Sequence, residues 1–158
     1  MKILREFYND NKDRFFGYLL RRTGDYQLAA DAMQESFARY IERYSKVEPS
    51  VSLLYTIGRN FLNDNNRRQH KTTLFDEERH GGTFDQESVV MVREESRRVL
   101  KAIQQLEPDE ADVLSLVVTS GLSYREIAEL MGTTEANIKV KVHRSRLKLK
   151  NTLQTGES

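Results

Sequence analysis

Residues 123–150 read SYREIAELMGTTEANIKVKVHRSRLKLK, and this stretch carries the clearest structural signal in the sequence. Ser123 is followed three residues later by Glu126, which is the spacing of a capping box at a helix N-terminus. Gly132 follows the apolar residues of that helix, and glycine can adopt the left-handed conformation that a tight turn between helices requires. One of the two threonines that follow can cap a second helix. The stretch therefore predicts a helix-turn-helix unit.

The second helix of this unit has two distinct sides when its residues are placed at 100° per residue. We expect one side to face the core; it carries Ile138, Val142, Ser145 and Leu149. The opposite side is a stripe of Val140, His143, Arg144 and Leu147. Its edges are Lys139, Arg146 and Lys150 on one flank and Asn137, Lys141 and Lys148 on the other. A stripe of this kind between two rows of cations fits a helix in the major groove of DNA.

The charge of this helix stands out from the rest of the chain. Residues 136–150 hold six lysines and arginines and no acid, whereas the whole protein has a net charge of only +1. Such a local basic run is a candidate nucleic-acid footprint. The alternative is a solvated helix face, which is common for charge runs.

Composition excludes several classes of protein. The 158 residues include no cysteine, so disulfides, thiolate zinc sites and cysteine nucleophiles are ruled out. The three histidines lie far apart in the sequence, and no apolar run approaches the ~20 residues that a membrane span needs. The N-terminus shows no apolar core of a secretory signal. We expect a cytoplasmic protein without membrane insertion, metal, cofactor or small-molecule substrate.

Helical periodicity without strand-like alternation predicts an all-α chain of two small domains joined by a flexible linker. The first domain spans residues 1–68, with helices expected over residues 2–22, 25–44 and 50–68. Residues 69–88 are mostly polar and include two adjacent glycines, which indicates the linker. The second domain spans residues 89–158 and contains the helix-turn-helix; its helices are expected over residues 88–106, 108–120, 123–131 and 134–150.

The helix over residues 25–44 has an apolar and an acidic face. The face expected in the core carries Ala30, Met33, Phe37, Tyr40, Ile41 and Tyr44. The opposite face carries Asp31, Glu35, Ala38 and Glu42, with Gln34 at its flank. Taken alone, this pattern is typical of an ordinary solvated helix face.

The helix over residues 50–68 is expected to bury Leu53, Leu54, Ile57 and Phe61. Its other face carries Tyr55, Arg59, Leu62, Asn63 and Asn66, with Asn60 at the border and Arg67 and Arg68 following. A tyrosine ring can stack on an unpaired base, amides can bond to base edges, and cations can hold phosphates. The face therefore suits single-stranded nucleic acid, and plain polar surface is the alternative.

Three segments in this order resemble the bacterial RNA polymerase sigma factors of the extracytoplasmic-function (ECF) group. DYQLAADAMQESF at residues 25–37 resembles the helix with which these factors bind core polymerase. LYTIGRNFLND at residues 54–64 resembles the helix that meets the −10 promoter element. GLSYREIAELMG at residues 121–132, continued to VHRSR at residues 142–146, resembles the domain that reads the −35 element.

The resemblance implies a role for each surface. Asp31, Gln34 and Glu35 match polymerase-binding positions, and Asn60 matches a position that meets an unpaired non-template base. The expected −10 contacts are Tyr55, Arg59, Asn60, Asn63, Arg67 and Arg68. The expected −35 contacts are Asn137, Lys139, Val140, Lys141, His143, Arg144, Arg146 and Lys148. Core RNA polymerase, promoter DNA and an anti-sigma factor are the implied partners.

Two positions depart from the family pattern. Leu53 stands where the family usually has tryptophan, and the chain has no tryptophan at all. Val140 stands where the family's recognition helix usually carries a small polar residue. Valine cannot hydrogen-bond a base edge, but it can contact a thymine methyl group. The promoter sequence of relatives should therefore not be transferred to this chain.

Together these features predict a transcription initiation factor that binds core RNA polymerase, directs it to promoters and assists strand opening, and that is not an enzyme. A free-standing helix-turn-helix regulator acting as a dimer is the main alternative, although it leaves the two faces of the first domain unexplained. A small helical hydrolase is a second alternative. Its candidate residues Asp76, Glu77, Glu78 and His80 lie in the linker, where geometry is poorly held.

Overall fold

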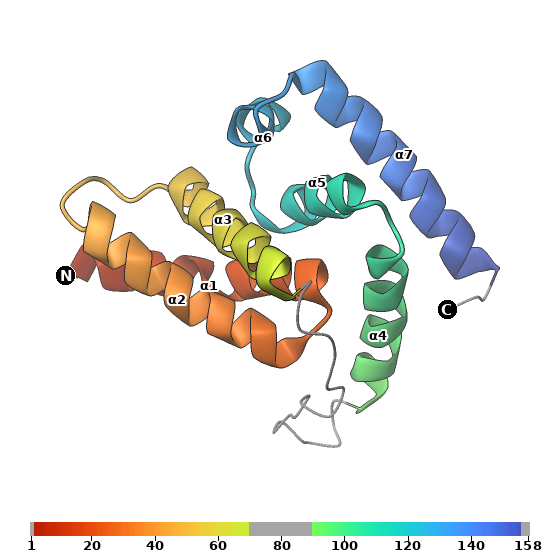
Figure 1. The fold of residues 1–158 in the computed structure, drawn as a ribbon, viewed down its shortest axis with the longest axis horizontal. Helices are drawn as coiled ribbons and strands as arrows, with labels where there is room; N and C mark the ends of the chain where they lie inside the picture. Colours follow the sequence, from red (N-terminus) through yellow and green to blue (C-terminus); the bar gives the residue numbers. More distant parts are fainter. Residues whose placement is uncertain (1, 70–89, 156–158) are drawn as a thin grey trace. The chain divides into compact units, whose positions relative to one another are not determined.

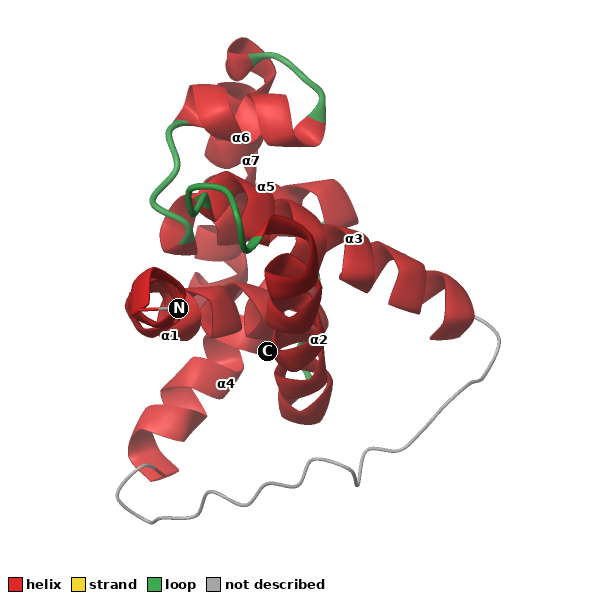
Figure 2. Cartoon of the chain, turned by 90° about the vertical axis from the view of Figure 1, so that its left-hand side faces the viewer, coloured by secondary structure: helices red, strands yellow, loops and turns green. Residues whose placement is uncertain are grey.

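The computed structural model describes the backbone of residues 2–69 and 90–155 and the side chains of residues 2–64 and 97–155. Every regular element in these ranges is an α-helix, which confirms the all-α prediction (Figures 1 and 2). The chain divides into two units, Met1–Gly81 and Gly82–Ser158. The predicted linker lies, apart from Gln69, outside the described residues.

The first unit contains α1 (Lys2–Thr23), α2 (Tyr26–Tyr44) and α3 (Val51–Gln69). Gly24 ends α1 with a φ of 67°, and its N–H donates to the Leu20 carbonyl at 2.7 Å. Asp25 then caps α2 by accepting from the Leu28 N–H at 3.1 Å. This two-residue connection turns α2 back along α1, as Figure 1 shows.

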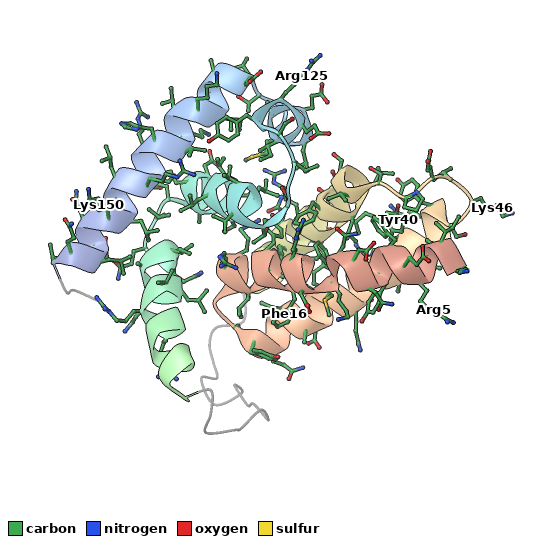
Figure 3. The ribbon with its side chains drawn as sticks, turned by 180° about the vertical axis from the view of Figure 1, so that it is seen from behind. Arg5, Phe16, Tyr40, Lys46, Arg125 and Lys150 are labelled. Carbon is green, nitrogen blue, oxygen red and sulfur yellow. The ribbon has the colours of Figure 1, made fainter. Side chains whose placement is uncertain are left out.

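An aromatic cluster forms the core of the first unit. The Phe15 ring of α1 packs edge-on against Phe37 of α2 and Tyr55 of α3, with centroid separations of 5.6 and 5.0 Å. Tyr40, labelled in Figure 3, is fully buried, and its hydroxyl accepts from the Ser50 N–H at 2.8 Å. This bond ties the loop before α3 to α2. All three helices therefore converge on one small core.

The faces of α2 and α3 differ in part from the predicted ones. Ile41 was expected in the core but is exposed, and small residues of α2 such as Ala32 are buried instead. Tyr55 and Leu62 were expected on the outer face of α3, and this prediction is wrong because both are buried. Ala32, Tyr55 and Leu62 are buried because α2 and α3 each pack against two other helices of this unit, so each buries a wider arc than a single apolar stripe. Ile41 lies outside the arc that α2 buries.

The predicted core positions Phe37, Tyr40, Leu54 and Ile57 are confirmed as buried. The remaining expected core residues of these helices are only half-buried; they are Ala30, Met33, Tyr44, Leu53 and Phe61. The apolar residues that the sequence marks as core are thus mostly sheltered, but the packing of three helices decides which are sealed from water.

The second unit contains α4 (Val90–Gln104), α5 (Pro108–Thr119), α6 (Tyr124–Met131) and α7 (Glu135–Gln154). The predicted capping box is confirmed, since Ser123 Oγ accepts from the Glu126 N–H at 3.0 Å and Glu126 Oε1 from the Ser123 N–H at 2.8 Å. Gly132 adopts a φ of 72°, as the turn requires, and Thr134 caps α7. The helix-turn-helix is therefore present at the predicted residues.

Within the described residues, no helix combines the length and the apolar character that crossing a membrane takes.

Gly58 provides a test of the packing in the first unit. A Cβ at this position would lie 2.6 and 2.8 Å from two atoms of the Phe15 ring, which cannot move freely because Phe37 and Tyr55 enclose it. We predict that Gly58→Ala lowers the free energy of unfolding, since overpacking of about 1–3 kcal/mol outweighs the gain in helix propensity. Thermal unfolding followed by circular dichroism measures the change.

Phe15→Leu supplies the control for this prediction. The smaller side chain makes room for a methyl group, so the double variant should lose less stability than the sum of the two single variants. A higher unfolding midpoint for Gly58→Ala than for the natural chain would contradict the proposed contact.

Candidate nucleic-acid interface

Helix α7 is seated on the rest of its unit by a row of buried residues. Ile138, Val142 and Ser145 are buried, as predicted, and Leu149 packs on the cluster formed by residues of α4 and α5. Ser145 Oγ donates to the Lys141 carbonyl at 2.6 Å and lies 3.4 Å from the Glu110 carbonyl oxygen of α5. The small serine therefore lets α7 lie close against α5.

The opposite side of α7 is a solvent-exposed stripe. Val140 and Leu147 are 45% and 50% exposed, and His143 and Arg144 between them are exposed as well. Figure 3 shows side chains projecting along the whole length of α7, with Lys150 near its end. Side chains able to contact base edges thus share one open helix face, as the sequence predicts.

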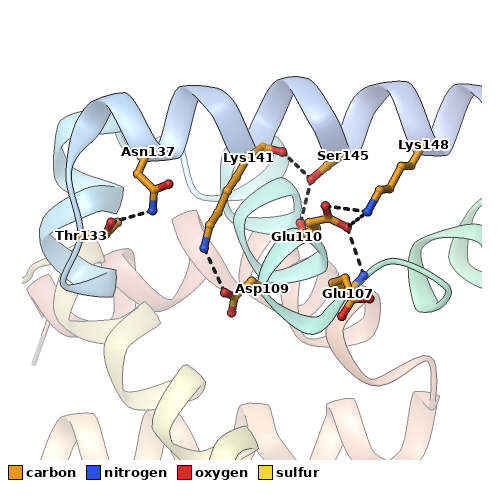
Figure 4. A network of polar contacts seen from close by, with 8 residues as sticks. All are labelled: Glu107, Asp109, Glu110, Thr133, Asn137, Lys141, Ser145 and Lys148. Atoms are coloured by element: carbon orange, nitrogen blue, oxygen red, sulfur yellow. Dashed lines mark hydrogen bonds and ion pairs between the residues drawn. The ribbon is translucent and has the colours of Figure 1, made fainter.

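The two edges of this stripe differ in their ion pairing. Lys141 Nζ lies 2.9 Å from Asp109 Oδ2, and Lys148 Nζ lies 2.9 Å from both carboxylate oxygens of Glu110 (Figure 4). Both acids belong to the first turn of α5. Lys139, Arg146 and Lys150 on the other edge make no ion pair within the described part of the chain.

Glu110 is the most sheltered of these charged groups. Its side chain is only 10% exposed, and its carboxylate also accepts from the Glu107 N–H at 3.2 Å. The hydrogen bond from Lys148 lowers the pKa of Glu110, burial opposes this shift, and the charges of Lys148 and Arg144 add to the lowering. Glu110 therefore stays ionised and holds the two helices together.

Asn137 also has a partner inside the unit. Its side-chain amide donates to Thr133 Oγ1 at 2.8 Å (Figure 4). Its backbone N–H donates to Thr134 Oγ1 at 3.1 Å. The amide therefore braces the turn between α6 and α7.

Helix α3 presents a smaller polar face than the sequence predicts. Asn60 and Asn63 are exposed and Arg59 is half-buried. Tyr55 is fully buried against Phe15 and Tyr18, with centroid separations of 5.0 and 5.3 Å, so its ring is not available to stack on a base. The side chains of Arg67 and Arg68 lie outside the described residues.

Helix α2 exposes all three residues assigned to polymerase binding. Asp31, Gln34 and Glu35 lie on its open side, and Asp31 Oδ1 accepts from the Gln27 amide at 3.1 Å. Glu35 pairs with Arg39 at 3.1 Å. The Arg39 guanidinium in turn lies 5.4 Å from the centroid of the Phe61 ring on α3.

Sequence reasoning missed the pairing of α5 with α7. Asp109 and Glu110 carry a local signal, because acids favour the first turn of a helix. Their partners lie 32 and 38 residues further along the chain, and no spacing rule connects them.

The hydrolase alternative gains no support from the described residues. None of their histidine, aspartate or glutamate side chains forms a group of three that could hold a metal ion. Asp76, Glu77, Glu78 and His80 lie outside the described residues.

Comparisons with known proteins agree with this architecture. Residues 7–72 match the family described as Sigma-70 region 2, and residues 96–149 match Sigma-70, region 4. The ECF RNA polymerase sigma factor SigM of Bacillus subtilis (strain 168) is 30% identical over 152 residues, which cover 92% of this chain and 91% of SigM. The ECF RNA polymerase sigma factor SigL of Mycobacterium tuberculosis (strain ATCC 25618 / H37Rv) is 27% identical over 158 residues, 96% of this chain and 89% of SigL.

A solved structure shares the fold. It is the sigma factor RpoE in its complex with the anti-sigma factor NepR from Bartonella quintana, which superposes with a TM-score of 0.77 at 20% identity. The match covers 99% of this chain and 100% of that one.

The two helical units and the exposed face of α7 define a sigma-70-type transcription initiation factor. Within that class, the chain belongs to the ECF RNA polymerase sigma factors. As such it is a DNA-binding protein that acts with RNA polymerase in transcription initiation. A free-standing dimeric regulator is not favoured, because it does not account for the match over residues 7–72.

The ion pair between Glu110 and Lys148 predicts how stability depends on pH. Because the pKa of Glu110 is lower in the folded state, the pair stabilises the fold above the ordinary value of 4.5, and this stabilisation is lost as the pH falls through the folded-state pKa. We expect Glu110→Gln to lower the unfolding temperature of the second unit at pH 7, and the deficit to shrink towards about pH 3.

Thermal unfolding followed by the NMR signals of the buried Ile138 methyl groups reports on this unit. Glu129→Gln is the matched control, because Glu129 is an exposed glutamate of α6 that makes no ion pair within the described residues. A Glu110→Gln deficit that is the same at pH 7 and at about pH 3 would show that the carboxylate charge is not the cause.

Proposed function

We propose that the two units divide promoter recognition between them. Residues 1–68 bind core polymerase and the −10 element, residues 69–88 connect the units, and residues 89–158 read the −35 element. The observation that carries this proposal is the exposed stripe of α7, which combines a guanidinium, an imidazole and two apolar side chains. The opposite side of the same helix is buried against the rest of the unit. The protein acts by recognition and not as an enzyme.

In the −35 role, α7 enters the major groove with its exposed stripe towards the bases. Arg144 has the planar fork that can bond bidentately to guanine O6 and N7, and Val140 is exposed enough to contact a thymine methyl group. Lys139 and Arg146, on the edge of the stripe that makes no ion pair within the described residues, can hold phosphates.

In the −10 role, the exposed amides of α3 act on the separated strand. Asn60 and Asn63 can hydrogen-bond to edges of unpaired bases, and Arg59 supplies positive charge next to them. Capture of bases that leave the stack offsets the unstacking cost of a few kcal/mol per step and so assists melting. Tyr55 is not part of this proposal, because its ring is needed in the core.

Polymerase binding is assigned to the exposed acidic side of α2. Asp31, Gln34 and Glu35 offer two carboxylates and an amide, spaced i, i+3 and i+4, about one turn apart on one side of the helix. Because core polymerase is cytoplasmic, we propose that the protein acts in the cytoplasm.

The solved structures with this fold include a sigma factor bound to an anti-sigma factor, and we propose a partner of that kind for this chain.

The polymerase assignment predicts the effect of charge reversal. Asp31→Lys together with Glu35→Lys should weaken binding to core polymerase about tenfold or more, because like charges in an interface cost several kcal/mol. Both residues are exposed, so the fold should lose no more than about 0.5 kcal/mol per substitution. Fluorescence titration of labelled protein with core polymerase measures the affinity.

Glu6→Lys with Asp10→Lys is the matched control on α1. These two acids are also exposed and four residues apart, so the change in charge and helix spacing is identical. Equal affinity for both double variants and the natural chain would remove the acidic side of α2 from the interface.

The −35 assignment predicts two kinds of defect on α7. Arg144→Ala should cost ~1–3 kcal/mol on the correct −35 element and relax the preference at one base pair. Arg146→Ala should weaken binding about equally on all sequences and reduce the salt slope by roughly one unit. Holoenzyme binding to promoter variants at several salt concentrations separates the two.

Both arginines are exposed on the same helix, so each serves as the control for the other. If neither substitution changes promoter affinity, the basic run on α7 is only a solvated face and the −35 assignment fails.

A further inference from the structure

The pairing of α5 with α7 has a consequence for DNA binding. The salt-dependent part of DNA affinity grows with the number of cations that contact phosphates, because each contact releases a condensed counterion. By sequence, α7 offers six cations. Two of them, Lys141 and Lys148, are already held 2.9 Å from carboxylates of the same unit.

We propose that Asp109 and Glu110 are built-in counter-charges of the recognition helix. They hold Lys141 and Lys148 as positioning residues that orient α7 on α5, and they keep these two cations off the DNA phosphates. The proposal rests on the −35 role proposed for α7. It adds that sequence-independent affinity comes from the other edge of the helix, which carries Lys139, Arg146 and Lys150.

The burial of the two pairs supports this division. Lys141 is the more sheltered partner of its pair, with 25% of its side chain exposed, and it lines an open depression together with Asp109 and Arg144. In the other pair the carboxylate of Glu110 is the sheltered partner. Pulling Lys148 away would leave a nearly buried carboxylate without its ammonium, which is strongly unfavourable.

The same acids shape the path of the DNA. Glu107, Asp109 and Glu110 line the depression at the edge of α7 that holds Lys141, so a phosphate approaching there meets negative charge. Lys139, Arg146 and Lys150 on the opposite edge make no ion pair within the described residues. A phosphate backbone therefore binds along that edge, while the edge facing α5 maintains the orientation of the helix.

The salt dependence of promoter binding tests the proposal. Holoenzymes carrying each variant are titrated into a fluorescent promoter duplex, and into the same duplex with a scrambled −35 element, at salt concentrations between about 50 and 200 mM. The slope of log affinity against log salt counts the phosphate contacts.

Three single variants give distinct expectations. Lys139→Gln should reduce the slope by ~0.9, because it removes a free cation. Lys141→Gln should leave the slope unchanged, because the lysine is held by Asp109. Asp109→Asn should release Lys141 and increase the slope by ~0.9 on both duplexes, which corresponds to a roughly 3.5-fold larger loss of affinity over that salt range.

Asp109→Asn keeps a residue that suits the start of a helix, and circular dichroism checks that the helix content is retained. The double variant Asp109→Asn with Lys141→Gln should return the slope to that of the natural chain, which a purely structural effect of Asp109 would not produce.

Two results would overturn the proposal. One is a reduced slope for Lys141→Gln equal to that for Lys139→Gln, which would show that Lys141 leaves Asp109 for a phosphate. The other is an unchanged slope for Asp109→Asn. Failure of the −35 role itself is distinguishable, because then Lys139→Gln and Arg144→Ala would also have no effect on promoter binding.

Discussion

The close packing of α7 on α5 determines which side of α7 is exposed. Ser145 is fully buried between the two helices, and its hydroxyl donates a hydrogen bond to the Lys141 carbonyl at 2.6 Å, so the buried polar group is satisfied. Once Ile138, Val142 and Ser145 face inward, the period of the helix obliges Val140, His143 and Arg144 to face out. A larger residue than serine at this point would tilt the helix and move the stripe.

In the first unit, an aromatic cluster has the corresponding role. The Phe15 ring lies over Gly58 and touches rings from α2 and α3, so a single side chain sets the separation of three helices. This arrangement buries Tyr55 and leaves Asn60 and Asn63 on the open side of α3. The polar residues proposed to contact polymerase and single-stranded DNA are among those that stay exposed once this core has formed.

The charges on α7 illustrate why the number of cations in a basic run does not by itself show how many are available to phosphates. Two of the six cations on α7 are paired with acids of α5, whereas three of the others make no ion pair in the described residues. Under the proposed −35 role, the cations of one helix serve two purposes: two orient the helix, and the unpaired ones attract phosphate. The distinction matters because only unpaired charge contributes to counterion release.

The features that depend on residues close together along the chain can be predicted from the sequence alone. The caps at Ser123 and Thr134, the turn at Gly132 and the inward side of α7 follow from spacings of a few residues, and all are present. The sigma-factor family and the exposure of Asp31, Glu35 and Arg144 were likewise predictable from local motifs and helical period.

The remaining features depend on contacts between helices that are distant from one another in the sequence. Tyr55 is buried because three helices share one core, so each buries a wider arc than a single helical wheel predicts. Ile41 is exposed because it lies outside the arc that α2 buries. Lys141 and Lys148 find their acids 32 and 38 residues away, across the contact between α5 and α7. Local periodicity carries no information about such long-range contacts, because they form only when separate helices pack against one another.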